Sequence, residues 1–283
     1  MRPWLLLCGL SLAVHAAEEP AFTPLLDAKL SQWETWLGVP HRAYEVPGYV
    51  RGATAKDDPV LGLNRDPLGV FTASMVDGEP VLRITGQVFG GLTSLNSYSD
   101  FHLRTQQRWG KLKWPPRLEA VRDNGILIYC VGEHGAGGKN WMRSQECQVQ
   151  EGDIGDWWPI AGTMVDATLR DEGKTVVFDP KSPVRAMKTR IWHGTDYHEK
   201  PSGEWNTIEV YSLNGTAIFR LNGTTVNVVA NSRYKEKGSD QEIPLKAGKL
   251  QIQSEAAECF YRRMEIRPLK AWPKEVAGDA PTK

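Results

Sequence analysis

The segment TIEVYSLNGTAIFRLNGTTVNVV, residues 207–229, decides the fold class because it contains three short β-type runs joined by two tight turns. Apolar and polar residues alternate along much of each run, as in strands that bury one face. The pairs Asn214-Gly215 and Asn222-Gly223 separate the runs. Asn-Gly favours the type I′ turn of a two-residue hairpin. The segment therefore predicts three consecutive antiparallel strands.

Runs of the same kind recur along the rest of the chain, whereas helical periodicity is scarce. They occupy residues 80–85, 100–106, 125–131, 175–178, 249–253 and 259–266. So many strands at this spacing, with no separating linker, predict an all-β chain folded as a two-sheet antiparallel sandwich. We expect one domain over residues 18–269, with an irregular Gly-, Pro- and Asp-rich insertion at 38–69 and a loose tail at 270–283.

Residues 1–17 have a basic start, an apolar run and the small-residue end Ala16-Ala17. This pattern predicts a cleaved signal peptide, and so a periplasmic or secreted protein with no membrane span. The chain has 34 basic and 34 acidic side chains. Zero net charge argues against nucleic acid or an anionic membrane as a partner.

The cysteines and histidines give no metal signature. Cys130, Cys147 and Cys259 lie in apolar runs without close spacing, so we expect buried free thiols, with one disulfide as the open alternative. No HxH or HExxH pair occurs. We therefore predict no certain cofactor and leave a divalent cation open. Asp153-x-x-Asp156 could suggest calcium, but a glycine-assisted turn is the commoner explanation.

Residues 143–150 look like a strand with an unusually polar face. Alternation places Glu146 and Gln148 on one face and Gln145, Cys147 and Val149 on the other. The polar face is either solvated or the floor of a sugar-binding cleft, since amides and carboxylates bond hydroxyls in pairs and aromatic rings stack on sugars. The spacing Glu146-x-Gln148-x-x-Glu151 resembles the Glu-x-Asp-x-x-Glu strand of laminarinase-type glycosidases. Gln in place of the middle Asp weakens a direct-hydrolysis interpretation.

Other candidates surround this strand in sequence. His134 lies in the Gly-rich loop 132–138, from which it could reach a cleft as an acid or base near neutral pH. Five tryptophans cluster nearby, and we expect at least one of them to line the cleft. The predicted substrate contacts are Arg143, Gln148, Trp109, Lys111, Tyr129, Trp141 and His193.

An ordered series of motifs resembles the 3-keto-disaccharide hydrolase family from about residue 22 to residue 269. The series comprises residues 22–27, 98–104, 109–117, 122–125, 146–157, 203–209, 221–223, 251–255 and 260–268. The resemblance implies a concanavalin-like, laminarinase-like jelly roll. It also implies action on 3-keto-glycosides that a partner sugar 3-dehydrogenase makes. Tyr129 stands where relatives commonly have His, which implies altered activity or specificity.

The implied chemistry needs few groups. A C3 ketone acidifies the C2 proton, and loss of that proton expels the C1 aglycone by elimination; water can then add, giving net hydrolysis. We predict Glu146 as the base, His134 as the acid and Trp109 as the aromatic platform. Two alternatives remain: a non-catalytic carbohydrate-binding module or lectin, and a laminarinase-like hydrolase.

Overall fold

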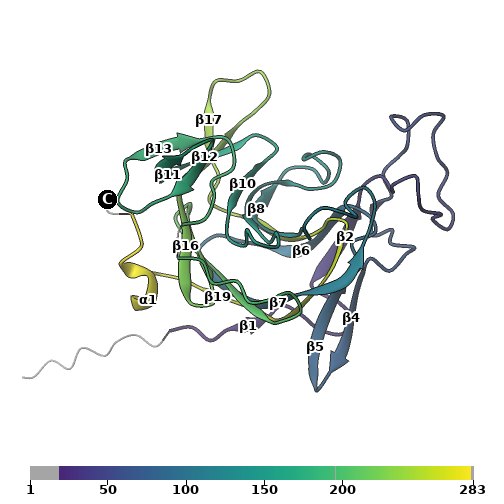
Figure 1. Cartoon of the computed structure of the whole chain (residues 1–283), viewed down its shortest axis with the longest axis horizontal. Helices are drawn as coiled ribbons and strands as arrows, with labels where there is room; N and C mark the ends of the chain where they lie inside the picture. The colour runs from purple at the N-terminus through teal and green to yellow at the C-terminus, as the bar shows by residue number, and fades with distance from the viewer. Residues whose placement is uncertain (1–18, 195, 282–283) are drawn as a thin grey trace, which may run out of the picture.

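The computed structural model describes residues 19–194 and 196–281, and almost all of its regular structure is β-strand (Figure 1). The predicted signal peptide, residues 1–17, lies outside the described residues. The three-strand prediction is confirmed as β14 (Asn206–Leu213), β15 (Thr216–Leu221) and β16 (Thr224–Lys235). At the two turns Asn214 and Asn222 have φ of 51° and 50°, and a glycine with positive φ follows each. Asn and Gly are the residues that tolerate this geometry.

The larger sheet has 12 strands and runs in the order β12-β11-β16-β15-β14-β7-β19-β5-β4. Three short strands join it at the side, β1 on β19, β13 on β11 and β17 on β16. The remaining bounds are β1 (Thr23–Pro24), β4 (Phe71–Val76), β5 (Glu79–Ile84), β7 (Phe101–Lys113), β11 (Thr163–Glu172), β12 (Thr175–Phe178), β13 (Val184–Met187), β17 (Glu242–Pro244) and β19 (Ala257–Pro268).

The smaller sheet has seven strands in the order β10-β9-β8-β18-β6-β2-β3, and all its neighbours are antiparallel. Its strands are β2 (Trp33–Leu37), β3 (Gly62–Leu63), β6 (Gly90–Tyr98), β8 (Gly125–Val131), β9 (Arg143–Gln148), β10 (Trp157–Ile160) and β18 (Gly248–Ser254). Two antiparallel sheets of this kind confirm the predicted all-β jelly-roll sandwich.

The hydrophobic core lies between the sheets and fixes which face of the smaller sheet is free. Cys147, Trp157 and Ile126 belong to this core. Gln145 also points inward, where its amide bonds Trp157 and Ser232. The predicted alternation therefore holds, because Glu146 and Gln148 must lie on the opposite face. Cys130, Cys147 and Cys259 are buried and free, as expected.

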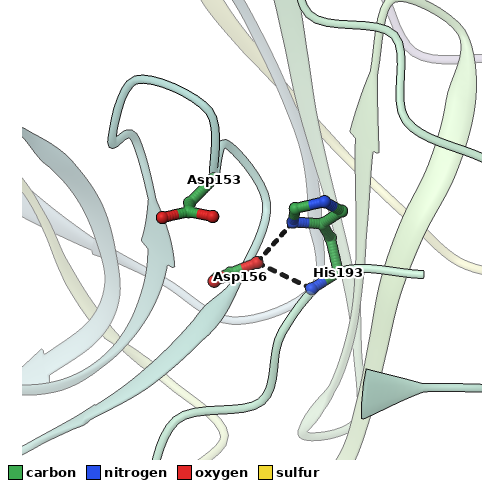
Figure 2. Close-up of side chains that lie close together, drawn as sticks. All are labelled: Asp153, Asp156 and His193. Atoms are coloured by element: carbon green, nitrogen blue, oxygen red, sulfur yellow. Dashed lines mark hydrogen bonds and ion pairs between the residues drawn. The ribbon is translucent and has the colours of Figure 1, made fainter. Parts of the chain in front are cut away.

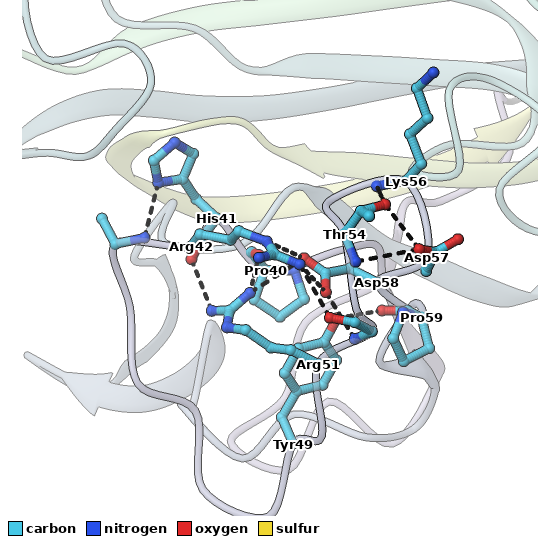
Figure 3. Close-up of polar contacts among 12 residues, drawn as sticks. Pro40, His41, Arg42, Tyr49, Arg51, Thr54, Lys56, Asp57, Asp58 and Pro59 are labelled. Atoms are coloured by element: carbon cyan, nitrogen blue, oxygen red, sulfur yellow. Dashed lines mark hydrogen bonds and ion pairs between the residues drawn. The ribbon is translucent and has the colours of Figure 1, made fainter.

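The insertion at 38–69 is irregular apart from β3, and a buried ion pair holds it together (Figure 3). The Asp58 carboxylate, 2% exposed, accepts hydrogen bonds from Arg42 at 2.8 Å and from the Gly52 N–H at 2.9 Å. Arg51 lies 3.5 Å from the same carboxylate. The Tyr44 hydroxyl donates to the Pro115 carbonyl at 2.7 Å, which ties the insertion to the turn after β7.

The C-terminal segment is packed rather than loose. The short helix α1 (Lys274–Ala277) places Val276 in the core with 1% exposure. The sequence prediction missed this because two large apolar residues, Trp272 and Val276, in a Pro-, Lys- and Ala-rich segment are too few to give a periodic signal. Among the described residues, no helix is long and apolar enough to cross a membrane.

Candidate active site

The free face of the smaller sheet, here called the polar face, carries two rows of paired residues. One row runs across five strands from Glu34 through Thr93, Gln251 and Leu127 to Glu146. The second contains Trp36 and Gly91 at one end and Gly125 and Gln148 at the other. Gln253 pairs with Gly91 within this second row. A sheet face this rich in amides and carboxyls, and opposite the core, is the natural place for polar chemistry.

Three carboxyl groups converge at one end of the polar face. Asp123 and Glu255 face each other in an isolated bridge just beyond β8 and β18. Glu146 extends toward them over Gly125, where an added Cβ would come within 2.1 Å of the Glu146 Oε1 atom. The same Cβ would lie 2.6 Å from Oε1 of Gln253. Because Gly125 has no side chain, it leaves a hollow in which the Glu146 carboxyl and the Gln253 amide meet.

These carboxyl groups hold their protons unusually tightly. Burial, together with repulsion from Glu255 and Asp123, raises the pKa of Glu146 well above its ordinary value. Burial and the charge of Asp123 raise the pKa of Glu255 to about 8. Burial raises the pKa of Asp123 to about 7, although the nearby Arg117 guanidinium opposes the rise. Three carboxylates in one dry hollow cannot all ionise, so the cluster keeps protons at neutral pH.

Arg117 is the cation that touches this cluster directly. Its guanidinium lies 2.6 Å from Asp123 and 3.3 Å from Glu255, and about a quarter of its side chain is exposed. It follows the Pro115-Pro116 turn, so the rigid turn after β7 positions it. Arg117 is therefore the boundary between the carboxyl cluster and solvent.

A second arginine approaches from the β10 side. Arg190 lies between the rings of Trp158 and Trp192, at 5.5 Å and 4.4 Å from their centroids. Its positive charge opposes the rise in the pKa values of Asp123 and Glu146, although both remain raised. Trp158, the cross-strand partner of Glu146, is the most exposed aromatic residue beside the cluster at 36%. It offers a ring face of the kind that stacks on sugars.

Asp153, Asp156 and His193 lie close enough to hold a metal ion (Figure 2). Both carboxylates, however, are already paired with Arg190, which lies 2.7 Å from Asp153 and 2.6 Å from Asp156. Asp156, fully buried, also accepts the His193 backbone N–H at 2.6 Å and contacts the His193 ring at 2.7 Å. In the described structure these side chains therefore act as the anchor of Arg190.

Two buried acceptors in the cluster have no hydrogen-bond partner within residues 19–194 and 196–281. They are Oδ1 of Asp123 and Oε1 of Gln253. Buried polar atoms are satisfied in the great majority of cases. Both atoms are thus available to donors that a ligand brings, such as sugar hydroxyls.

His134 does not reach Glu146. Its ring stacks on Trp36 at 5.3 Å and its Nε2 lies 3.2 Å from Glu34, at the other end of the polar face. Four strand-to-strand steps separate Glu34 from Glu146, roughly 19 Å along the sheet at about 4.8 Å per step. The predicted acid–base pair of Glu146 and His134 therefore cannot act on one bond.

Four predicted substrate contacts lie away from the site. Trp109 is a core residue with 3% exposure, and Tyr129 is fully buried with its hydroxyl on Ser212. Trp109 faces inward by the alternation of its strand, whereas Tyr129 is turned inward at a bulge where its φ is 56°, so neither can form a platform. Arg143 points away from Glu146, toward Glu236 and the Tyr234 ring. Lys111 is an exposed residue of β7, in the larger sheet.

The other predicted contacts lie nearer. Gln148 shares the face of Glu146, although its Oε1 accepts the Val149 N–H at 3.0 Å. Trp141 donates its indole N–H to the Gly90 carbonyl at 3.0 Å and packs beside Leu127 in the middle of the polar face. His193 contacts the Asp156 anchor rather than the cluster.

We did not predict a catalytic or substrate-binding role from the sequence for Asp123, Glu255, Gln253, Arg117 and Arg190. A signal for some of them existed: residues 251, 253 and 255 repeat the alternating Gln and Glu pattern of residues 146 and 148. Two strands with the same polar alternation are candidates for one shared face. Arg117 and Arg190 lie outside strands, where alternation gives no information.

A cavity of about 300 Å³ lies beside the Pro115-Pro116 turn, and no residue of the carboxyl cluster is among its lining residues. It is enclosed by the insertion, by the loop 138–140 and by the Pro115-Pro116 turn that leads into Arg117. Gln87 and Phe89 close another side, next to Gly86, whose carbonyl accepts the Ala256 N–H beside Glu255. The cavity is therefore linked to the cluster through chain neighbours, Gly86 beside Gln87 and Ala256 beside Glu255.

Comparisons with known structures find sandwich folds at low similarity. A glycosyl hydrolase of unconfirmed activity from Parabacteroides distasonis is 16% identical, with a TM-score of 0.43, covering 70% of this chain and 90% of its own. The carbohydrate binding module CBM66 from Bacillus subtilis is 8% identical, with a TM-score of 0.40 and coverages of 70% and 91%. The Bacillus licheniformis beta-glucanase is 8% identical, with a TM-score of 0.39 and coverages of 90% and 100%. These likenesses are too distant to argue function.

A search of the curated proteins found no match to this chain. Among protein families, the 3-keto-alpha-glucoside-1,2-lyase-like domain matches residues 21–267, most of the chain and nearly all of the sandwich. This match supports a carbohydrate-active role. The chain belongs to the 3-keto-alpha-glucoside-1,2-lyase-like family, which the motifs of its sequence resemble.

Proposed function

We propose that this protein is an exported enzyme that cleaves 3-keto-glycosides by removing the C2 proton and expelling the C1 aglycone. The observation that carries the proposal is the cluster of three buried carboxyl groups with raised pKa values beside Arg117. Elimination next to a ketone needs a base, a proton donor for the leaving oxygen and a cation for the enolate. The cluster contains groups suited to each role.

Asp123 is the best base. Its pKa of about 7 leaves it substantially ionised at neutral pH, and the contact with Arg117 favours the ionised form. A base whose pKa lies near the working pH combines availability with basic strength. Asp123 would take the C2 proton, with Glu255 sharing the proton of the pair.

Glu146 is better suited to the role of acid than to that of base. Burial and repulsion from Glu255 and Asp123 raise its pKa well above the ordinary value, which favours the protonated form. It would donate that proton to the leaving C1 oxygen. The C2–H electrons first delocalise into the C3 ketone as the enolate, and they then form the C1–C2 double bond as the C1–O bond breaks. The product is an enone, to which water can add to give the free 3-keto sugar.

Arg117 would stabilise the enolate, and Trp158 would stack on the sugar ring. As the ketone oxygen gains charge, Arg117 can exchange part of its carboxylate contact for the new anion. The cavity bounded by the insertion would receive the aglycone. The 3-keto substrate would come from a sugar 3-dehydrogenase, and export would depend on residues 1–17.

The test is aglycone release from 3-keto-glucosides and from their unoxidised parents, with and without a chelator. We expect release only from the ketones, no effect of the chelator, and slower release when C2 carries deuterium and proton removal limits the rate. An Asp123→Asn protein purified in the same way excludes contaminating activity. Equal cleavage of the parents would identify a laminarinase-like hydrolase, whereas binding without turnover would identify a carbohydrate-binding module.

A further inference from the structure

A second cavity, of about 240 Å³, lies on the outer face of the larger sheet, on the far side of the sandwich from the carboxyl cluster. Strands β4, β5, β7 and β19 form its floor and Trp205, just before β14, forms one wall. Its charged and aromatic lining residues are Arg83, Arg108, Arg262, Glu79, Asp77, Trp205 and Phe260. The proposed reaction uses none of these residues.

Arg108 differs from the other two arginines of this cavity. Arg83 is paired with Glu258 at 2.8 Å and Arg262 with Glu79 at 2.9 Å. In the part of the chain that the structure describes, no carboxylate pairs with Arg108, and its Nε atom is buried without a hydrogen-bond partner. A partly desolvated guanidinium without a counter-charge is unfavourable, and an anion would relieve it.

Two aromatic rings hold Arg108 in a fixed position. Its guanidinium lies 4.8 Å from the Trp205 centroid and 5.1 Å from that of Phe260. Arg262 lies over the same Trp205 ring at 4.2 Å. Because guanidinium groups already lie against Trp205, the cavity offers fixed positive charge rather than a free ring for an uncharged sugar.

The opposite wall supplies groups that bond hydroxyls. Thr72 and Ser74 of β4 and the Glu79 carboxylate line it. A ligand that fits both walls carries one anionic group for Arg108 and hydroxyl groups for β4. The volume, below the roughly 300 Å³ at which drug-sized pockets begin, suits one such unit rather than an oligomer.

We propose that this outer cavity binds the carboxylate of a uronic acid unit, through Arg108. Arginine recognises a planar carboxylate through two parallel N–H···O bonds, which gives selectivity over a neutral sugar. Binding on this face leaves the carboxyl cluster open, so the site would keep the protein on an acidic polysaccharide while the polar face acts on a separate substrate.

The test is titration of the full chain with glucuronate, glucose, acetate and inorganic sulfate, followed by calorimetry or by NMR of the tryptophan indole signals. We expect glucuronate to bind more tightly than glucose, acetate or sulfate. Arg108→Gln should weaken glucuronate binding at least about 10-fold, the usual effect of losing a hydrogen bond between charged groups.

Arg104→Gln is the matched control, because Arg104 lies on the same strand and the same face but is already paired with Glu265. It should leave glucuronate binding within about 2-fold, and circular dichroism should show both variants folded. Equal losses in the two variants, or no binding of glucuronate at all, would overturn the proposal. Equal binding of glucose would refute a charge-selective site, and equal binding of sulfate or acetate would refute recognition of a uronic acid.

Discussion

The two ends of the polar face contain similar residues in opposite electrostatic states. At one end Glu34 lies against Lys249 at 2.6 Å and His134 at 3.2 Å, with Trp36 beside them. Burial alone would raise the pKa of Glu34, but hydrogen bonds and charge from Lys249 and His134 outweigh it and lower the pKa. At the other end three carboxyl groups have raised pKa values, and two of them, Asp123 and Glu255, contact Arg117.

The difference lies in the ratio of charges, not in residue type. The Glu34 carboxylate is paired with Lys249 and hydrogen-bonded to His134, and its lowered pKa favours the ionised form, so it is a stable partner in the fold rather than a proton donor. Three buried carboxyls with one direct cation retain protons that they can transfer. We therefore expect proton transfer at the Glu146 end and a structural role for the Glu34 end. Each prediction below tests this expectation.

Glu146→Gln should have the largest effect. The amide keeps the size of the side chain but removes the transferable proton, so turnover of an alkyl 3-keto-glucoside should fall by about 10²–10⁴-fold. A nitrophenyl aglycone leaves without protonation, so its release should fall much less. Equal losses on both substrates would instead make Glu146 the base. His134→Gln, at the other end, should change neither rate more than about 2-fold, and a larger loss would break the comparison.

Gly125→Ala should have the next largest effect, although it changes no polar group. The new Cβ would come within 2.1 Å of Glu146 Oε1, so the carboxyl must move out of its hollow. A displacement of this kind can reduce the rate by about 10²-fold. Gly278→Ala, where no atom lies within 4 Å of an added Cβ, is the control and should be neutral. Full activity of the Gly125 variant, measured in the same assay, would argue against a role for the hollow.

Trp158→Ala should act on binding. If this exposed ring stacks on the sugar, KM should rise roughly 10-fold, in line with the worth of one aromatic contact, while kcat stays within about 3-fold. Trp36→Ala, beside Glu34, should leave KM nearly unchanged. Similar KM increases in both variants would extend the substrate site along the whole polar face.

The smallest effect concerns stability, and it has opposite signs at the two ends. Glu255, with a folded pKa of about 8, contributes stability that is present below its ordinary pKa and is lost as the pH rises through 8. Glu34, with a lowered pKa, contributes stability that is lost as the pH falls through its folded pKa. The free energy of unfolding in urea, measured from pH 3 to 9, reports both contributions.

Glu255→Gln should therefore flatten the decline in the free energy of unfolding between pH 4.5 and about 8, by up to about 1.4 kcal/mol per pH unit, the value for one proton. Glu34→Gln should flatten the decline at acid pH instead. A Glu255 variant that retains the full slope between pH 4.5 and about 8 would show that this carboxyl is not protonated in the folded state.

The sequence predicted those features that depend on local patterns. Alternation placed Glu146 and Gln148 on the free face, and the Asn-Gly pairs located two hairpins. Local patterns also suggested that some tryptophan would line the site, but they did not show which. The prediction that Trp109 is the aromatic platform was wrong. The sequence near a tryptophan does not show whether its side chain faces the core or the solvent.

The carboxyl cluster depends on contacts between distant segments. Asp123 and Glu255 are 132 residues apart in the chain and meet only because β8 and β18 are neighbours in the sheet. Arg117 comes from a turn after a strand of the other sheet. Strand order is set by the packing of the whole sandwich, so neither contact follows from the residues near Glu146.

The three buried thiols have a practical consequence for the redox behaviour of the protein. Burial raises the pKa of Cys130, Cys147 and Cys259, and none of them forms a disulfide. Thiolate is the form that reacts with oxidants and disulfides, so these side chains are inert in the folded state. Folding of the sandwich thus requires no oxidant or disulfide isomerase, and reducing agents should leave its melting temperature unchanged.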